Sequence, residues 1–141
     1  MTEFVLDASV AVSWCFAGDP TEDTAYSRRV LAELSVRDAI VPEVWAFEIA
    51  NFIFVSFSKR KRITERQIDE YLGRLRTMPI QVEANDLWAN IGLESLARRC
   101  DQTAYDAAYL YLAARRNLPL ATADEKLKKA ALAEGIEVVG L

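Results

Sequence analysis

The sequence predicts an α/β domain in which a central parallel sheet of about five short strands carries helices on both faces. Short apolar runs alternate along the chain with longer segments whose apolar side chains recur at three-and-four spacing. Strands joined by such crossover helices form parallel sheets. The chain has 141 residues, of which 52% are hydrophobic, and this is enough for one ordinary core. We therefore expect a single domain over residues 1–141.

Each expected element rests on a local pattern. The apolar runs expected to form strands are, in order, 4–6, 39–41, 80–82, 118–121 and 136–139. The helical patterns cover 8–16, 21–36, 42–62, 64–76, 87–99, 103–116 and 124–134. Pro42 suits a first helical turn, where no backbone donor is needed. Thr64 and Gln67 match the capping box that opens a helix, and Gly135 suits the position just after a helix end.

The composition excludes several kinds of site. The chain has no histidine, which removes Ser-His-Asp triads and the usual zinc, copper and iron ligand sets. Its two cysteines, Cys15 and Cys100, lack CxxC spacing, and we expect both to be small buried hydrophobic residues. The net charge of −4 does not mark a general nucleic-acid binder. It does not exclude one either, because bound cations neutralise the carboxylates of a metal site.

The sequence also predicts a cytoplasmic protein. The N-terminal stretch carries Glu3 and Asp7 where a signal peptide would be apolar. No apolar run reaches the ~18 residues of a membrane span. We therefore expect no contact with a membrane.

Four acidic residues stand at places where function is the simplest explanation. Asp7 and Asp124 each follow an apolar strand, and ligand sites in parallel sheets lie beyond the carboxyl ends of strands. Asp106 precedes a nearly apolar helix, and Glu48 interrupts another, with Asn51 three residues on, on the same face. Each has a structural alternative: Asp124 and Asp106 suit helix starts, and Glu48 could pair with a buried Arg or Lys.

If the four carboxylates meet, their mutual repulsion requires protons or cations. Two like charges ~4 Å apart repel by about 4 kcal/mol at an effective dielectric of ~20. Oxygen ligands alone suit Mg²⁺ or Mn²⁺. Two such ions can activate water and stabilise a leaving oxygen, which favours phosphodiester hydrolysis as the reaction.

Four segments in this order resemble the PIN-domain ribonucleases, and most closely the VapC toxins of bacterial and archaeal toxin-antitoxin pairs. These segments are VLDAS at 5–9, PEVWAFEIAN at 42–51, TAYDAAYL at 103–110 and ATADEKL at 121–127. The resemblance implies that Asp7, Glu48, Asp106 and Asp124 converge on Mg²⁺ or Mn²⁺ and that the protein cleaves RNA endonucleolytically. It implies supporting polar roles for Ser9, Asn51 and Thr122.

The resemblance also implies partners. Family members commonly form homodimers and are silenced by a VapB antitoxin whose C-terminal segment lies across the active site. The phenylalanines of residues 42–58 are compatible with a helix that packs against a second subunit. Gln102 departs from the apolar residue that relatives often have there.

The basic run Lys59, Arg60, Lys61 and Arg62 lies outside the family motifs. It suits a solvated helix C-terminus, where cations are favourable, and the alternative is a contact with the RNA backbone. The alternative functions are a non-catalytic PIN-fold module that binds RNA or protein, and a phosphohydrolase that forms an aspartyl-phosphate. The latter usually has a second Asp two residues after the first, where this chain has Ser9.

Overall fold

The computed structural model describes residues 3–140 and contains a four-stranded parallel sheet with the strand order β3-β2-β1-β4. The strands are β1 (Phe4–Leu6), β2 (Ala39–Pro42), β3 (Ile80–Glu83) and β4 (Leu120–Ala121). The first strand is central and fully buried, and it pairs with β2 on one side and β4 on the other. The α/β class predicted from the sequence is confirmed.

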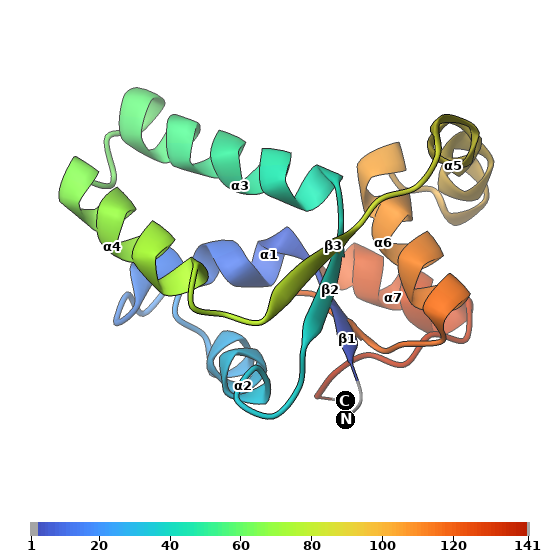
Figure 1. The fold of residues 1–141 in the computed structure, drawn as a ribbon, viewed down its shortest axis with the longest axis horizontal. Helices are drawn as coiled ribbons and strands as arrows, with labels where there is room; N and C mark the ends of the chain where they lie inside the picture. The colour runs from blue at the N-terminus through green and yellow to red at the C-terminus, as the bar shows by residue number, and fades with distance from the viewer. Residues whose placement is uncertain (1–2, 141) are drawn as a thin grey trace.

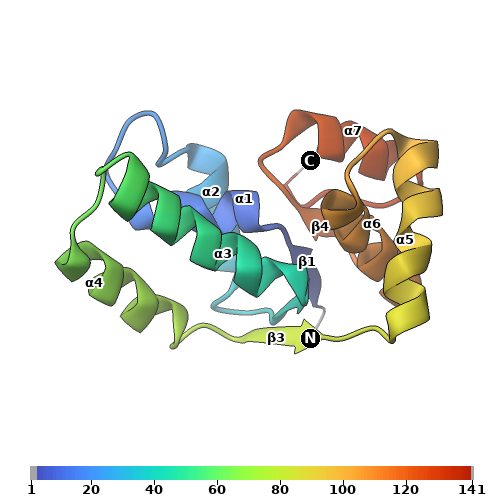
Figure 2. The ribbon, with the colours of Figure 1, turned by 90° about the horizontal axis from the view of Figure 1, so that it is seen from above.

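Helices cover both faces of this sheet (Figure 1). The helices are α1 (Ala8–Ala11), α2 (Ala25–Glu33), α3 (Val44–Phe54), α4 (Glu65–Leu75), α5 (Leu87–Cys100), α6 (Ala104–Arg116) and α7 (Glu125–Ala133). Helices α1 to α4 lie on one side of the sheet and α5 to α7 on the other. Figure 2 shows the same division from above, with α5 beside α6. Helix α6 packs on β1 and β2 and joins the main core.

Several helix ends lie where the sequence predicts them. The side chain of Thr64 accepts from the Gln67 N–H at 3.1 Å while the Gln67 side chain accepts from the Thr64 N–H at 2.8 Å, which completes the capping box. Gly135 follows α7 with a φ of +76°. Only glycine adopts this left-handed conformation without steric cost, and it ends the helix there.

Pro42 is the last residue of β2, and the prediction that it begins the helix is wrong. It pairs with Glu83 of β3, and α3 begins at Val44. The N–H of Ala39 points toward β3, where it donates to the Pro79 carbonyl. Because N–H directions alternate along a strand, position 42 faces β1, which pairs only with Ala39 and Ile40. A residue without an N–H is therefore tolerated there.

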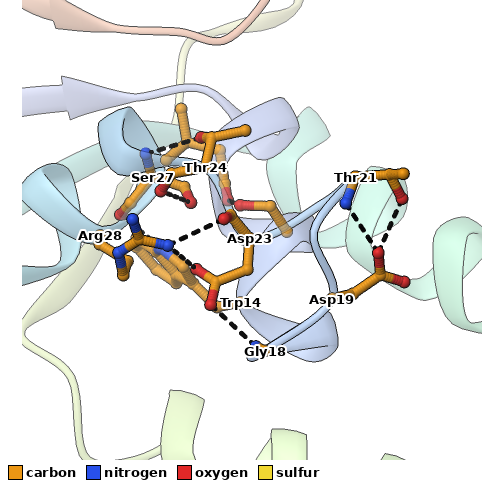
Figure 3. A network of polar contacts seen from close by, with 10 residues as sticks. Trp14, Gly18, Asp19, Thr21, Asp23, Thr24, Ser27 and Arg28 are labelled. Atoms are coloured by element: carbon orange, nitrogen blue, oxygen red, sulfur yellow. Dashed lines mark hydrogen bonds and ion pairs between the residues drawn. The ribbon is translucent and has the colours of Figure 1, made fainter.

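The second helix starts at Ala25, four residues later than predicted, because a hydrogen-bonded loop precedes it (Figure 3). Asp19 Oδ1 accepts from both the N–H and the hydroxyl of Thr21. Asp23 Oδ2 accepts from the Gly18 N–H, and Asp23 pairs with Arg28 at 3.1 Å. The Thr24 hydroxyl then caps α2 by accepting from Ser27 N–H. These turn contacts compete with helix formation over residues 19–23.

Two further expectations are corrected in detail. The predicted strand 136–139 is reduced to a single parallel bridge between Leu120 and Val138, with two backbone hydrogen bonds to Leu120. The first and third helices change their winding near their ends: α1 continues as the 3₁₀ helix Val12–Phe16, and α3 continues as the π-helical turn Val55–Lys59. The remaining helices agree with the predicted ranges within a residue or two.

Within residues 3–140, none of the helices has both the length and the apolar character needed to cross a membrane. Both cysteines are free thiols. Cys15 is buried as expected, whereas Cys100 at the end of α5 is only partly buried.

Candidate metal site at the carboxyl edge of the sheet

Asp7 immediately follows β1, and its side chain is 4% exposed. Its Oδ2 accepts two hydrogen bonds, from the Ser9 hydroxyl at 2.6 Å and from the Thr122 hydroxyl at 2.7 Å. Burial raises the pKa of the Asp7 carboxyl above its ordinary value; these two hydrogen bonds oppose the rise, and the negative charge of Asp124 adds to it. Asp7 is therefore a buried carboxylate whose charge is only partly compensated by protein groups.

Asp124 reaches the same edge because β4 pairs with β1, with Ala121 opposite Leu6. Its Oδ1 accepts from the N–H groups of Lys126 and Leu127, at 2.9 and 3.3 Å, and so caps α7. The capping alternative is thus confirmed for one oxygen. Among the residues that the structure describes, Oδ2 accepts no hydrogen bond, and it remains available to a ligand.

Glu48 approaches from the second turn of α3 and is half-buried. Its Oε1 accepts a hydrogen bond of 2.6 Å from the hydroxyl of Tyr109. Burial raises the pKa of the Glu48 carboxyl; the Tyr109 hydrogen bond opposes this, and the charges of Asp7 and Asp106 add to it. A neutral hydroxyl thus takes the place of the Arg or Lys that the structural alternative required.

Asp106 lies in the first turn of α6, where its N–H donates to the Thr103 hydroxyl at 3.1 Å. Burial raises the pKa of its carboxyl, and the charges of Asp7 and Asp124 raise it further. An interaction of the carboxyl itself with the Thr103 side chain and the cation of Lys126 oppose this rise. Asp106 therefore faces the same negative field as the other three carboxylates.

The four carboxylates thus form one electrostatic cluster from four elements. The charge of Asp7 repels the charges of the other three carboxylates. Glu48 and Asp106 also repel each other, as do Asp106 and Asp124. Within residues 3–140, no three Asp, Glu, Cys or His side chains already form a cluster able to hold a metal ion. Repulsion favours such separation of like charges. The donor set nevertheless fits a hard cation, since it consists of carboxylate oxygens and the burial of Asp7 and Glu48 is not offset by Arg or Lys.

The supporting residues predicted from the sequence divide into two groups. Ser9 and Thr122 lie in the cluster: they share Asp7 Oδ2, and their hydroxyls accept from the N–H groups of Ala123 and Asp124, at 3.0 and 3.1 Å. Asn51 is exposed on α3, one turn beyond Glu48. Within the described part of the chain, no hydrogen bond links Asn51 to the carboxylates.

The basic run lies away from the carboxylates. Lys59 ends the π-helical turn that continues α3, roughly 16 Å along the helix from Glu48, and residues 60–62 follow it. Arg62 pairs with Glu22 at 3.2 Å and lies over the Phe16 ring, and Lys59 lies over the Phe54 ring. Arg60 and Lys61 are exposed and make no ion pair within residues 3–140. Lys59 and Arg62 therefore take part in the packing of the fold, whereas Arg60 and Lys61 are free to bind an anion.

An apolar groove borders the cluster. It is lined by α3 residues that include Val44 and Phe47, by Leu93 of α5, and by Ala104 and Tyr105 of α6. Phe47 and Tyr105 directly precede Glu48 and Asp106, and their side chains are 75% and 65% exposed. The neighbouring face of α5 also exposes Leu87, Trp88 and Ile91. The carboxylates therefore lie beside an unusually apolar surface.

Sequence reasoning missed Tyr109 and Lys126. Tyr109 is fully buried and follows Asp106 by three residues, so the two share a helix face. The three-residue spacing from Asp106 was the only sequence pattern that pointed to Tyr109. Nothing else in this apolar helix distinguishes it from the other aromatic residues. Lys126 pairs with Asp101 at 3.4 Å, and its charge acts on Asp106. Nothing in its position in the sequence distinguished it from other surface lysines.

Comparison with known proteins agrees with this fold. No curated protein matches the sequence. A crystal structure described as PAE2754 from Pyrobaculum aerophilum is similar, with a TM-score of 0.66 over 92% of this chain and 79% of that chain, at 18% sequence identity. At this identity the likeness concerns the fold alone. The PIN domain family model matches residues 4–132, which is most of the chain, and PIN domains are generally nucleases. This protein therefore belongs to the PIN domain family.

Proposed function

We propose that this PIN domain is an Mg²⁺- or Mn²⁺-dependent endoribonuclease of the VapC toxin type. The observation that carries the proposal is the cluster of four mutually repelling carboxylates, three of which have a pKa raised first by burial. Such an arrangement is costly without a cation and is typical of active sites that bind one. The family match supports the nuclease class, and the sequence motifs of VapC toxins support the finer assignment.

The residues of the cluster have distinct tasks in this mechanism. Asp7, Glu48, Asp106 and Asp124 would hold the cation with their free carboxylate oxygens. The bound cation would activate a water molecule and stabilise the leaving oxygen of the RNA strand. Ser9 and Thr122 orient Asp7 by donating to a single oxygen, Oδ2. The cap of α7 fixes the backbone of Asp124, so this carboxylate reaches the site from a rigid helix start.

Cleavage of RNA by the purified protein tests this function. Total cellular RNA is incubated with Mg²⁺, with Mn²⁺ and with a chelator, and the fragments are sequenced at their ends. Asp7→Asn and Glu48→Gln should remove cleavage while the circular dichroism spectrum stays unchanged. Glu65→Gln, at an exposed position in the first turn of α4, is the matched control and should cleave normally. Undiminished cleavage in both cluster variants would refute the assignment of the site.

Two partners follow from the same proposal. A second copy of the chain would cover the exposed apolar side chains of Phe47 on α3 and of Leu87, Trp88 and Ile91 on α5. A VapB-type antitoxin would silence the enzyme by laying its C-terminal segment across the carboxylates. We further propose the cytoplasm as the place of action, because RNA and a cognate antitoxin are both available there.

A further inference from the structure

We propose that Tyr109 is a positioning residue for the metal centre, which holds Glu48 in the orientation that a divalent cation requires. The inference rests on the proposed function and adds a residue to that site. The Tyr109 hydroxyl donates to Glu48 Oε1 at 2.6 Å, across 61 residues of sequence. Because the Tyr109 side chain is fully buried in the core, its hydroxyl is held in place by the packing of α6 and not by α3.

A tyrosine suits this task better than a cationic partner. An Arg or Lys would neutralise Glu48 and compete with the metal for it, whereas a phenolic hydroxyl fixes one oxygen and leaves the negative charge in place. Within the described residues, Oε2 of Glu48 accepts no hydrogen bond. The carboxylate is thus held at one oxygen and open at the other, as in metal proteins whose ligands are oriented by hydrogen bonds from neighbouring side chains.

The same hydroxyl also touches the backbone beside Asp7. The Ala8 N–H points at the Tyr109 oxygen at 3.4 Å, at the start of α1. Asp106 lies one turn before Tyr109 on α6. One hydroxyl therefore connects the segments that carry Glu48, Asp7 and Asp106. Among the carboxylates of these three segments, the Tyr109 hydroxyl donates to Glu48, the one that we propose it positions.

The test measures the affinity for Mn²⁺ alone, by electron paramagnetic resonance or calorimetry, in Tyr109→Phe. The matched control is Tyr71→Phe, because Tyr71 is also buried and its hydroxyl also donates one hydrogen bond, to the Ala11 carbonyl at 2.5 Å. We expect Tyr109→Phe to weaken Mn²⁺ binding by about 10-fold or more and Tyr71→Phe to change it little. Equal affinity in the two variants would overturn the proposal.

A double-mutant cycle shows whether Tyr109 acts through Glu48. If it does, Glu48→Gln with Tyr109→Phe binds Mn²⁺ no more weakly than Glu48→Gln alone. Losses that multiply in the double variant would contradict the inference. In cleavage assays, Tyr109→Phe should raise the Mn²⁺ concentration needed for half-maximal rate, while the rate at saturating Mn²⁺ stays near that of the unaltered enzyme. A purely structural role would not produce this separation.

The outcomes separate this inference from the proposed function. If Mn²⁺ binds and depends on Glu48 and Tyr109 while no RNA is cut, the positioning role holds and the ribonuclease assignment fails. If RNA is cut but Glu48→Gln binds Mn²⁺ normally, the positioning role fails. Should Tyr109→Phe not fold, a crystal structure of the unaltered protein with Mn²⁺ decides: the contact between Tyr109 and Oε1 must persist, and a hydroxyl turned away from Glu48 refutes the proposal.

Discussion

The hydroxyl of Thr122 donates to Asp7 Oδ2 and at the same time accepts from the Asp124 N–H. Thr122 is fully buried between the ends of β4 and α7. A single side chain thus links the carboxylate of Asp7 to the backbone of Asp124, two residues of the proposed metal site. Its hydrogen bonds account for part of the local stability and for part of the acidity of Asp7.

Thr122→Val tests this link, because valine keeps the shape and removes the hydroxyl. The Asp124 N–H loses its acceptor, and Asp7 loses one of its two hydroxyl donors, so we expect a loss of about 1–3 kcal/mol in the free energy of unfolding by urea. The pKa of Asp7 should rise further, which moves the acid limb of the pH-rate profile to higher pH. Ser9→Ala, at a less buried position, should show the same shift with a smaller loss of stability. An unshifted profile in both variants would contradict this role.

The metal-free protein should be most stable in mild acid. Burial in the folded state raises the pKa values of Asp7, Glu48 and Asp106. The folded protein therefore binds protons at these three carboxyls more readily than the unfolded chain does. Their protonated forms therefore favour folding, and this contribution is lost as pH rises through the raised values toward neutrality. Asp19 and Asp23 have lowered pKa values, and the stability they confer is lost below about pH 4.

Thermal unfolding in a chelating buffer measures this dependence between pH 4 and 8. Asp7→Asn should melt at a higher temperature than the unaltered protein at neutral pH and should show a weaker pH dependence, since it removes the most buried of these charges. For a chain of this size, about 1 kcal/mol corresponds to roughly 2–4 °C. A melting temperature that falls steadily from neutral pH to pH 5 would show that the charged carboxylates of the cluster do not destabilise the folded protein.

Mn²⁺ should stabilise the folded protein at neutral pH, because it replaces the missing counter-charge of the cluster. A ligand that binds only the native state at 100 times its Kd adds about 2.7 kcal/mol. The melting temperature should therefore rise with Mn²⁺ concentration, and the rise should be largely absent in Asp7→Asn and Asp106→Asn. Glu65→Gln serves again as the control. A similar rise in all variants would indicate binding elsewhere on the surface.

Arg60 and Lys61, the exposed middle residues of the basic run, should contribute to the affinity for RNA and not to the cleavage step. Replacing both Arg60 and Lys61 by Ala should weaken binding of single-stranded RNA and reduce the slope of log affinity against log salt by about 1.4, at ~0.7 per phosphate contact. The control replaces Arg66 and Arg98, which pair with Glu70 and Glu94 on exposed helix faces. Filter binding over a salt series measures the slope, and equal slopes in the two double variants would refute the contact.

The apolar surface beside the site should mediate self-association. Trp88→Ser and Phe47→Ser each remove a large exposed side chain from it and should shift the protein toward monomers in light scattering. Leu132→Ser, on the exposed face of α7, is the control and should leave the mass unchanged. A monomer at all concentrations before any substitution would remove the basis for the proposed homodimer.

Local chemistry explains which features of the fold were predictable. The capping box at Thr64 and the glycine after α7 depend on neighbours within a few residues, and both predictions are confirmed. The position of Pro42 depends on how far β1 pairs with β2, which is a tertiary fact. The loop before α2 depends on which of several Asp and Thr side chains form turns, and the sequence allows several combinations.

The sequence singled out the four carboxylates of the proposed site and did not predict their contacts. Strand ends and an unusual acidic residue in an apolar helix located the four carboxylates, since their chemistry conflicts with their surroundings. The partner of Glu48 was not predictable, because Tyr109 lies on a different helix. Neither local sequence indicates that the two helices contact each other at these residues. Packing between distant segments decides such contacts.

The pairing of β1 with β4 has a consequence for synthesis. Asp7 and Thr122 are 115 residues apart in the chain, so β1 is synthesised long before the strand β4 that it pairs with. A nascent chain therefore lacks the complete set of four carboxylates until residue 124 has emerged. The proposed metal site can therefore form only late in translation.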